Sequence, residues 1–292
     1  MALGKQLYFD ARLSKGQDVS CASCHDLARY GQDAEITSPG HKKQRGGRNS
    51  PTTLNASIHF VQFWDGRAKD VEEQAKGPVT NPIEMAMAND GAVVAVLASI
   101  PEYEAAFKAA FPGDPKPTSF DNMAKAIGAF ERTLLTPAPW DKFLAGDDKA
   151  LTDAQKKGFE TFHAKACFSC HMGEGLGGTT YQKVGAIVPW PNQKDQGRFD
   201  LTKKEEDRMM FKVPSLRNVA KTAPYFHDGS AKTLPEAVKM MGKHQLSLDL
   251  KDAEIASIVA FLEALTGELP KDVIAPPTPF KSTPKTPKPD LL

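Results

Sequence analysis

All four cysteines of the chain lie in two copies of one short pattern that can attach haem. The first copy is CASCH at residues 21–25, and the second is CFSCH at residues 167–171. In a C-x-x-C-H motif the thiols bond to the vinyl groups of haem, and the adjacent histidine binds the iron. We therefore predict two covalently bound haem c groups. Their attachment residues are Cys21, Cys24, Cys167 and Cys170, and their first iron ligands are His25 and His171.

Three other uses of the cysteines explain the pattern less well. A four-thiolate zinc site would have to bring Cys24 and Cys167 together across the chain, and it would leave both histidines without a role. A thioredoxin-like C-x-x-C pair normally lies in a βαβ pattern, which this sequence lacks. Disulfides would account for the cysteines but not for the repeated histidine.

The segments that flank the motifs repeat as well. Gly4 lies four residues before Tyr8 and ahead of the first motif, as Gly158 lies four residues before Phe162 and ahead of the second. Each half begins with a helical apolar pattern, continues through its motif into a region rich in Gly and Pro, and closes with a helical stripe. No alternating strand pattern is convincing. The sequence predicts a mainly α fold with two cytochrome c-like domains, each holding one haem.

The boundaries follow from helix start and stop signals. We expect helices near residues 3–9 and 90–98, through 103–112, from Asp121 to Leu134, after a capping box at Thr152, and across 255–265. Thr136-Pro137 ends the first half and Gly267 the second, so the predicted domains are 1–136 and 137–269. Residues 270–292 form a Pro-rich tail with little that could pack, and we expect it to be extended or disordered.

The composition argues against nucleic acid and membranes as binding partners. With 37 basic and 36 acidic residues among 292, the formal charge of +1 gives no reason to expect nucleic-acid binding. No apolar run of about 18 residues is present, so we expect no membrane insertion. No leader precedes Leu3, yet haem attachment in bacteria usually takes place outside the cytoplasm. We therefore expect an exported protein whose signal peptide is absent from this chain.

The sixth iron ligand decides between electron transfer and catalysis. Methionine raises a haem potential, a second histidine generally leaves it lower, and an open position allows chemistry. On spacing alone, Met85 or Met87 could bind the first iron and Met240 or Met241 the second, as in a two-haem electron carrier. Most methionines fill cores. Composition and periodicity do not exclude such a two-haem electron carrier.

Several longer motifs carry a resemblance from Leu3 to about Gly267. They are LGKQLYFD at 3–10, GRNSPT at 47–52, FWDGRA at 63–68, NPIEM at 81–85, VPSLRN at 213–218, PYFHDG at 224–229 and MG at 241–242. In these motifs the chain resembles the bacterial dihaem cytochrome c peroxidases. The resemblance implies reduction of hydrogen peroxide to water with electrons from a small redox protein, either a c-type cytochrome or a cupredoxin.

The resemblance also assigns roles to residues. The first haem would be the low-potential, peroxidatic one, with His25 below and a removable distal His41 above. The second would be the high-potential entry point for electrons, with His171 and Met241. The remaining implied residues are an acid/base Glu84, a neighbouring Gln74, an inter-haem Trp64, and a calcium site formed by Asn49, Thr222 and Pro224. A periplasmic location and a homodimer are implied in the same way.

Elementary chemistry is compatible with these roles but does not require them. A carboxylate above an open haem can move a proton between the two oxygens of peroxide, which suits Glu84, and Gln74 could orient peroxide by hydrogen bonding. Without the resemblance, Glu84 is a solvated carboxylate after Pro82, His41 an exposed loop histidine, and Trp64 a packing residue. We treat the remaining histidines as structural or surface residues: His59, His163, His227 and His244.

Two rival functions follow from the same residues. A dihaem electron carrier would have methionine on both irons and no peroxide turnover. A protein-modifying oxygenase related to the methylamine dehydrogenase maturation enzyme would carry tyrosine on the second iron. The methionine at position 241 argues against the oxygenase.

Overall fold

Each half of the chain is built on two crossed helices that meet at a glycine. In the first half, α1 (Ala2–Tyr8) packs against α7 (Phe120–Glu131), and in the second, α9 (Asp153–Ala164) packs against α12 (Asp252–Glu263). A Cβ at Gly4 would overlap the main-chain oxygen of Ala126, and one at Gly158 would overlap that of Ser257. The repeated glycine therefore allows the two backbones of each pair to approach closely.

The computed structural model describes residues 1–291. The other helices of the first half are α2 (Cys21–Cys24), α3 (Val71–Gln74), α4 (Lys76–Thr80), α5 (Asp90–Ala98) and α6 (Pro101–Ala110). Those after residue 136 are α8 (Pro139–Leu144), α10 (Phe199–Thr202), α11 (Leu234–Leu246) and α13 (Lys271–Ile274). Within residues 1–291, no helix has the length and apolar character needed to cross a membrane.

For the predicted helices, the starts agree with the sequence to within three residues. The side chains of Thr152 and Gln155 form the predicted capping box of α9, with hydrogen bonds of 3.2 and 3.0 Å. The caps of α5 and α7 differ, because Asn89 and Ser119 cap them while Asp90 and Asp121 lie in the first turn. Acidic residues in the first turn of a helix interact favourably with the helix dipole, so they are common close to helix starts. This explains why Asp90 and Asp121 were predicted to be the caps.

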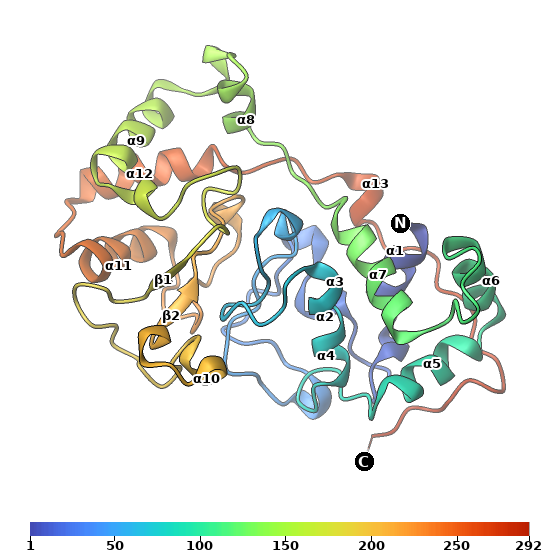
Figure 1. Cartoon of the computed structure of the whole chain (residues 1–292). Coiled ribbons are helices and arrows are strands. Elements are labelled where there is room, and N and C mark those ends of the chain that lie inside the picture. Colours follow the sequence, from blue (N-terminus) through green and yellow to red (C-terminus); the bar gives the residue numbers. More distant parts are fainter. Residues whose placement is uncertain (292) are drawn as a thin grey trace.

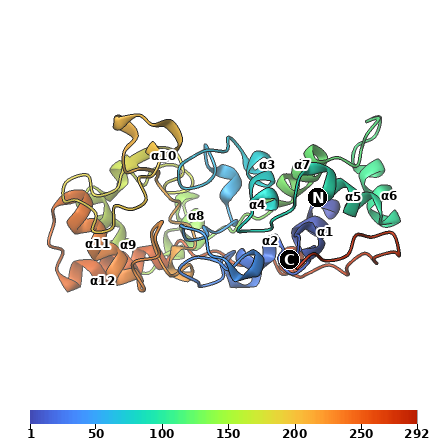
Figure 2. The ribbon, with the colours of Figure 1, turned by 90° about the horizontal axis from the view of Figure 1, so that it is seen from below.

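Among residues 1–291, the two largest apolar cores fall on either side of residues 136–139. The first contains buried side chains between Leu3 and Leu134, and the second contains those between Trp140 and Leu265. Figure 2 shows the two halves side by side along the long axis of the molecule. The predicted domains of 1–136 and 137–269 are compatible with this arrangement.

A short antiparallel pair of strands lies in the second half, where we expected none. β1 (Tyr181–Lys183) pairs with β2 (Met210–Lys212), and Tyr181 lies opposite Lys212. Three residues are too few to show an alternating pattern, so the sequence could not reveal these strands. They lie next to the first half and bring Lys212 to the boundary between the two halves.

The C-terminal segment is packed, which corrects the expectation of a tail with little to pack. After α13, the segment runs along the first half in both ribbon views (Figures 1 and 2). Phe280 meets Tyr103 edge-on with ring centroids 4.9 Å apart, and Lys5 donates a 2.7 Å hydrogen bond to the main chain of Asp272. The apolar residues Val273, Ile274 and Phe280 were too sparse among prolines to predict this contact with the first core.

A buried polar cluster joins the halves where the chain crosses between them. Asn55 and Asn218 each donate a 2.8 Å hydrogen bond to the hydroxyl of Thr136, and all three side chains are almost fully buried. Asn218 also accepts a 2.9 Å hydrogen bond from the main-chain N–H of Gly267. The cluster therefore holds both chain crossings, near residues 136 and 267, next to each other.

Candidate haem sites

The first C-x-x-C-H motif forms a single helical turn. Ser20 caps α2, its N–H bonding Ser23 Oγ at 3.0 Å, and the N–H of His25 bonds the Cys21 carbonyl at 2.9 Å. Residues three apart lie on the same side of a helix, so Cys21 and Cys24 face one direction. Burial raises the pKa of these thiols to about 12 and about 11, which disfavours the thiolate that zinc binding or redox exchange needs.

The surroundings of His25 favour a neutral imidazole. Burial lowers its pKa, and its Nδ1 is buried without a hydrogen-bond partner. The hydroxyl of Tyr8 donates a 2.7 Å hydrogen bond to the His25 main-chain oxygen and lies 3.0 Å from the hydroxyl of Thr53. A neutral imidazole on a fixed backbone is the form that binds haem iron.

His41 is buried, and its loop is attached to the Glu84 segment. Its side chain is 6% exposed, which excludes the reading of a solvent-exposed loop histidine. The His41 N–H donates a 2.7 Å hydrogen bond to the Glu84 carbonyl, and Gly40 packs against Ile83 so closely that a Cβ would overlap its oxygen. The loop from Pro39 to Gln44 thus has few apolar anchors, as expected, but it has specific polar and steric ones.

Glu84 lies close to the first haem motif. Burial is the main reason that the pKa of the Cys24 thiol is raised, a hydrogen bond from Ser38 opposes the rise, and the negative charges of Asp33 and Glu84 add to it. Burial raises the pKa of Glu84 itself, while Arg67 and Asn81 partly oppose the rise. The structure therefore brings Cys24, His41 and Glu84 together. Gln74 is half-buried at the end of α3, and no direct hydrogen bond joins it to Glu84 within residues 1–291.

The second motif presents its histidine with a defined tautomer. A 3₁₀ turn spans Cys167–Ser169, and the His171 N–H bonds the Cys167 carbonyl at 3.1 Å. The ring Nδ1 of His171 lies 3.2 Å from the carbonyl of Leu176 and must donate to it, because a carbonyl only accepts. Burial lowers the pKa of His171 to about 4. The neutral ring therefore keeps Nε2 free for iron.

A large cavity opens beside this second motif. Its empty volume is about 1270 Å³, part of it open to solvent, and its walls are almost entirely apolar. Pockets for cofactor-sized molecules are typically roughly 300–1,000 Å³ and mostly apolar. His227 also lines the cavity, and its Nε2 is buried without a partner. The residues present thus fit a haem bound through Cys167 and Cys170.

The methionines separate into cavity and core residues. Met241 lines the cavity that also contains His171, whereas Met240 is not among the described residues of the cavity wall and packs against the second core. Met85 and Met87 are 3% and 8% exposed within the first core. The structure thus favours Met241 over Met240 as the methionine near the second motif.

Trp64 belongs to the first half but reaches the second haem cavity. Its side chain lines that cavity, and its indole N–H donates a 2.9 Å hydrogen bond to the Asn49 carbonyl. Its own carbonyl accepts a 2.7 Å hydrogen bond from the N–H of Lys212, and its ring meets His227 edge-on at 6.3 Å. Both halves therefore fix the position of this indole.

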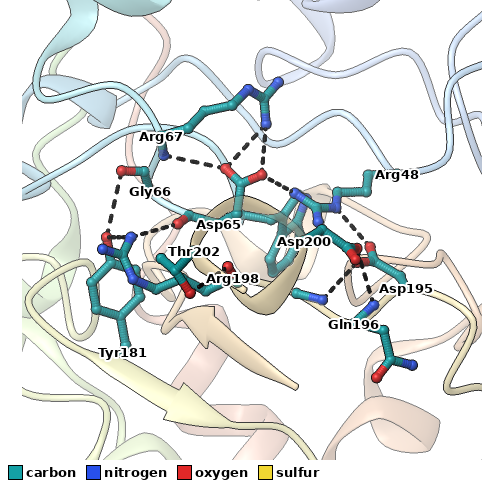
Figure 3. Close-up of polar contacts among 12 residues, drawn as sticks. Arg48, Asp65, Gly66, Arg67, Tyr181, Asp195, Gln196, Arg198, Asp200 and Thr202 are labelled. Atoms are coloured by element: carbon teal, nitrogen blue, oxygen red, sulfur yellow. Dashed lines mark hydrogen bonds and ion pairs between the residues drawn. The ribbon is translucent and has the colours of Figure 1, made fainter. Parts of the chain in front are cut away.

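An ion-pair network surrounds the Trp64 segment at the boundary (Figure 3). Arg48 binds Asp65 of its own half at 2.7 Å, and it binds Asp195 of the second half through two bonds of 2.6 and 2.8 Å. Arg198 of the second half donates a 3.0 Å hydrogen bond to the main-chain oxygen of Asp65 in the first half. Burial opposes ionisation of Arg48, but the two carboxylates raise its pKa overall. We did not predict this network, although Arg48 and Asp65 lie inside the quoted motifs.

The predicted calcium residues lie on facing segments. Asn49 donates its side-chain amide to the Glu35 carbonyl at 2.9 Å, which leaves Oδ1 available as a ligand, and its N–H bonds the His227 carbonyl at 2.7 Å. Thr222 and Pro224 lie shortly before His227, on the segment that Asn49 contacts. Within residues 1–291 no cluster of three His, Cys, Asp or Glu side chains could hold a metal. An ion here would need amide and main-chain oxygens.

Comparison with known proteins accounts for both halves. Residues 1–149 match the family model described as di-haem cytochrome c peroxidase, and residues 155–266 match that described as cytochrome c. A cytochrome c551 peroxidase of Nitrosomonas europaea is 48% identical over 280 residues, covering 94% of this chain and 83% of the relative. The chain belongs to the di-haem cytochrome c peroxidase family.

Other comparisons support this family membership. A cytochrome c551 peroxidase of Pseudomonas aeruginosa is 49% identical over 293 residues, covering 98% of this chain and 84% of the relative. The crystal structure of a MauG-like protein associated with microbial copper homeostasis superposes with a TM-score of 0.82 at 29% identity, covering 99% and 92% of the two chains. These findings confirm the mainly α fold, the two haem c groups and the cytochrome c peroxidase function that the sequence predicted.

Proposed function

We propose that this di-haem peroxidase reduces hydrogen peroxide at the first haem and receives electrons at the second from a small redox protein. The donor would be a c-type cytochrome or a cupredoxin. The observation that carries the proposal is the difference between the two sites. A buried histidine and a carboxyl group with a raised pKa lie by the first motif, whereas a methionine lines the cavity of the second.

Proton movement at the first site is assigned to Glu84. Reduction of hydrogen peroxide consumes two electrons and two protons and yields two waters. Haem iron supplies the electrons and the position where peroxide binds. Glu84 takes a proton from one peroxide oxygen and returns it to the other as the oxygen–oxygen bond breaks. Gln74 orients peroxide by hydrogen bonding from the end of α3.

Access to the first site is assigned to His41. If His41 held the iron of the first haem, peroxide would have no open binding position there. Withdrawal of the loop would break the 2.7 Å hydrogen bond from the His41 N–H to the main-chain carbonyl of Glu84. We infer that reduction of the second haem favours the withdrawn loop.

Electron transfer between the sites is assigned to Trp64. Met241 would hold the iron of the second haem through its sulfur, and such a ligand would stabilise the reduced state and give this haem a high potential. Trp64 lines that haem's cavity from the other half of the chain. Its double attachment, to Asn49 and to Lys212, supports a fixed bridge.

A calcium site between the two halves is also part of the proposal. Asn49 Oδ1 with the carbonyls of Thr222 and Pro224 would bind calcium, together with several waters because the protein shell is sparse. If chelation removes the ion without changing reductive activation, this assignment is wrong.

We also propose a periplasmic location and a homodimer.

The deciding experiment is a spectroscopic redox titration with peroxide added to the oxidised and half-reduced protein. Rapid reaction of the half-reduced form alone supports gating by His41. If both forms react with peroxide, gating by His41 is wrong but the peroxidase activity is supported. If neither form reacts, the result supports an electron carrier. Electron paramagnetic resonance of the oxidised protein checks the ligand, because a low-spin bis-histidine signal is expected.

The methionine assignment has a separate test. Met241→His should sharply lower the potential of the second haem, since imidazole favours ferrous iron less than thioether sulfur does. Met240→Leu is the matched control and should leave the potential unchanged. The opposite pattern would make Met240 the ligand.

A further inference from the structure

His59 and Lys212 form a buried pair at the boundary that none of the roles above uses. Lys212 is 5% exposed, and its Nζ lies 2.9 Å from His59 Nδ1. Within residues 1–291, His59 is the side-chain partner found for Lys212, and no carboxylate contributes to its pKa. A buried ammonium group without an anion is costly, so such a group requires an explanation.

The pair has a defined protonation state. Burial lowers the pKa of Lys212 to about 8, and burial together with the Lys212 charge lowers that of His59 to about 3. At neutral pH, therefore, a charged lysine donates to a neutral histidine. Nδ1 of His59 accepts, so Nε2 carries the hydrogen, and this Nε2 is buried without a partner.

The pair is held rigidly. A Cβ at Gly178 would overlap the His59 ring, so the ring packs directly on this backbone. The next residue, Phe60, donates its N–H to the Gly178 carbonyl at 2.9 Å, and the Lys212 N–H binds the Trp64 carbonyl at 2.7 Å. Lys212 therefore holds the Trp64 segment by its main chain and His59 by its side chain.

Lys212 also lines the cavity of the second haem. No Asp or Glu is among the residues of the cavity wall. The other lysine there, Lys165, already has Glu254 as its partner at 2.6 Å. Haem c carries two propionate carboxylates, and a buried carboxylate needs a counter-charge as much as a buried ammonium does.

We propose that Lys212, positioned by His59, is the counter-cation for a propionate of the second haem and so raises the potential of that haem. A nearby positive charge stabilises the reduced haem, which carries one positive charge less than the oxidised haem. The inference rests on the proposed entry of electrons at the second haem. Its test measures potential and vibrational spectra, so it can fail while peroxide turnover persists.

The test compares Lys212→Met with Lys183→Met in the purified two-haem protein. Lys183 lies on the paired strand β1 and is exposed, so it is a matched control. Lys212→Met should shift the midpoint potential of the second haem negatively and leave the first unchanged. It should also move the propionate bending band in the resonance Raman spectrum. An unchanged potential and band, or an equal shift in both haems, would overturn the proposal.

A second variant keeps the test decisive if Lys212→Met does not take up haem. His59→Asn retains the lysine but shortens the group that holds it. We expect a smaller negative shift of the same potential, with the same Raman band displaced. If this variant matches the unmodified protein in both measurements, Lys212 is not positioned by His59 as proposed.

Discussion

The carboxyl group of Glu84 has a raised pKa because it is largely buried, and this sets the pH range in which it can accept a proton. A base must be deprotonated before it acts. Turnover should therefore fall as the pH drops through the raised pKa of Glu84, at a higher pH than the ordinary glutamate value of 4.5 would give. The acid limb of a kcat profile measures this directly.

Replacement of the carboxyl group tests the same role. Glu84→Gln should lower kcat by roughly 10²–10⁴-fold, the usual contribution of a general acid/base. Haem content and spectra should stay unchanged, because the amide has nearly the same shape. Glu102→Gln, at an exposed position on α6, is the control. Full turnover in the Glu84 variant would transfer the proton role to another group.

The sequence predicted which residues belong to the first site, but it did not predict the surroundings of their side chains. The motifs pointed to Glu84 and His41, but they could not indicate that His41 is buried or which group binds its backbone. Lys212 and His59 are 153 residues apart, and neither has a local pattern that signals the other. Such pairs depend on how the two halves pack, which periodicity within one segment does not describe.

Among the elements, the His41 loop has the most specific attachment to its surroundings. Gly40→Ala should push the loop away from Ile83 and Glu84, because the added Cβ would overlap backbone atoms there. We expect a weaker bis-histidine signal and some peroxide reaction of the fully oxidised protein. Electron paramagnetic resonance and stopped-flow mixing with peroxide measure the two effects.

A glycine two residues beyond this loop supplies the control. Gly46→Ala places a Cβ where no atom lies within 4 Å, so the loop should stay in place. Equal behaviour of both variants and the unmodified protein would mean that contact with Ile83 does not hold His41 on the iron.

Six helices were predicted from the sequence, whereas α11, several short helices and both strands were not. The stripe of Met123, Ile127 and Phe130 on α7 reports burial along a whole helix face. β1 and β2 are three residues each, and they are set by hydrogen bonds to each other and to the Trp64 segment. An element that short leaves no period to detect.

For the molecule as a whole, the packed C-terminal segment should contribute to the stability of the first half. Phe280→Ala removes a partly buried ring from Tyr103 and should lower the free energy of unfolding by about 1–3 kcal/mol, less than for a fully buried ring. Thermal unfolding followed in the haem absorption band measures the loss. Lys281→Ala, at the exposed neighbouring position, should have little effect. Equal stability of the two variants would mean that the segment only lies on the surface.

The polar cluster around Thr136 restricts how the two halves can move. The chain passes between the halves twice, and Gly267 packs so closely on Thr136 that a Cβ would overlap its oxygen. Both chain crossings therefore keep the two halves together at this place, while the Arg48–Asp195 ion pair joins them elsewhere. If the halves move relative to one another, we expect the displacement to be smallest near Thr136 and larger at the Arg48–Asp195 pair.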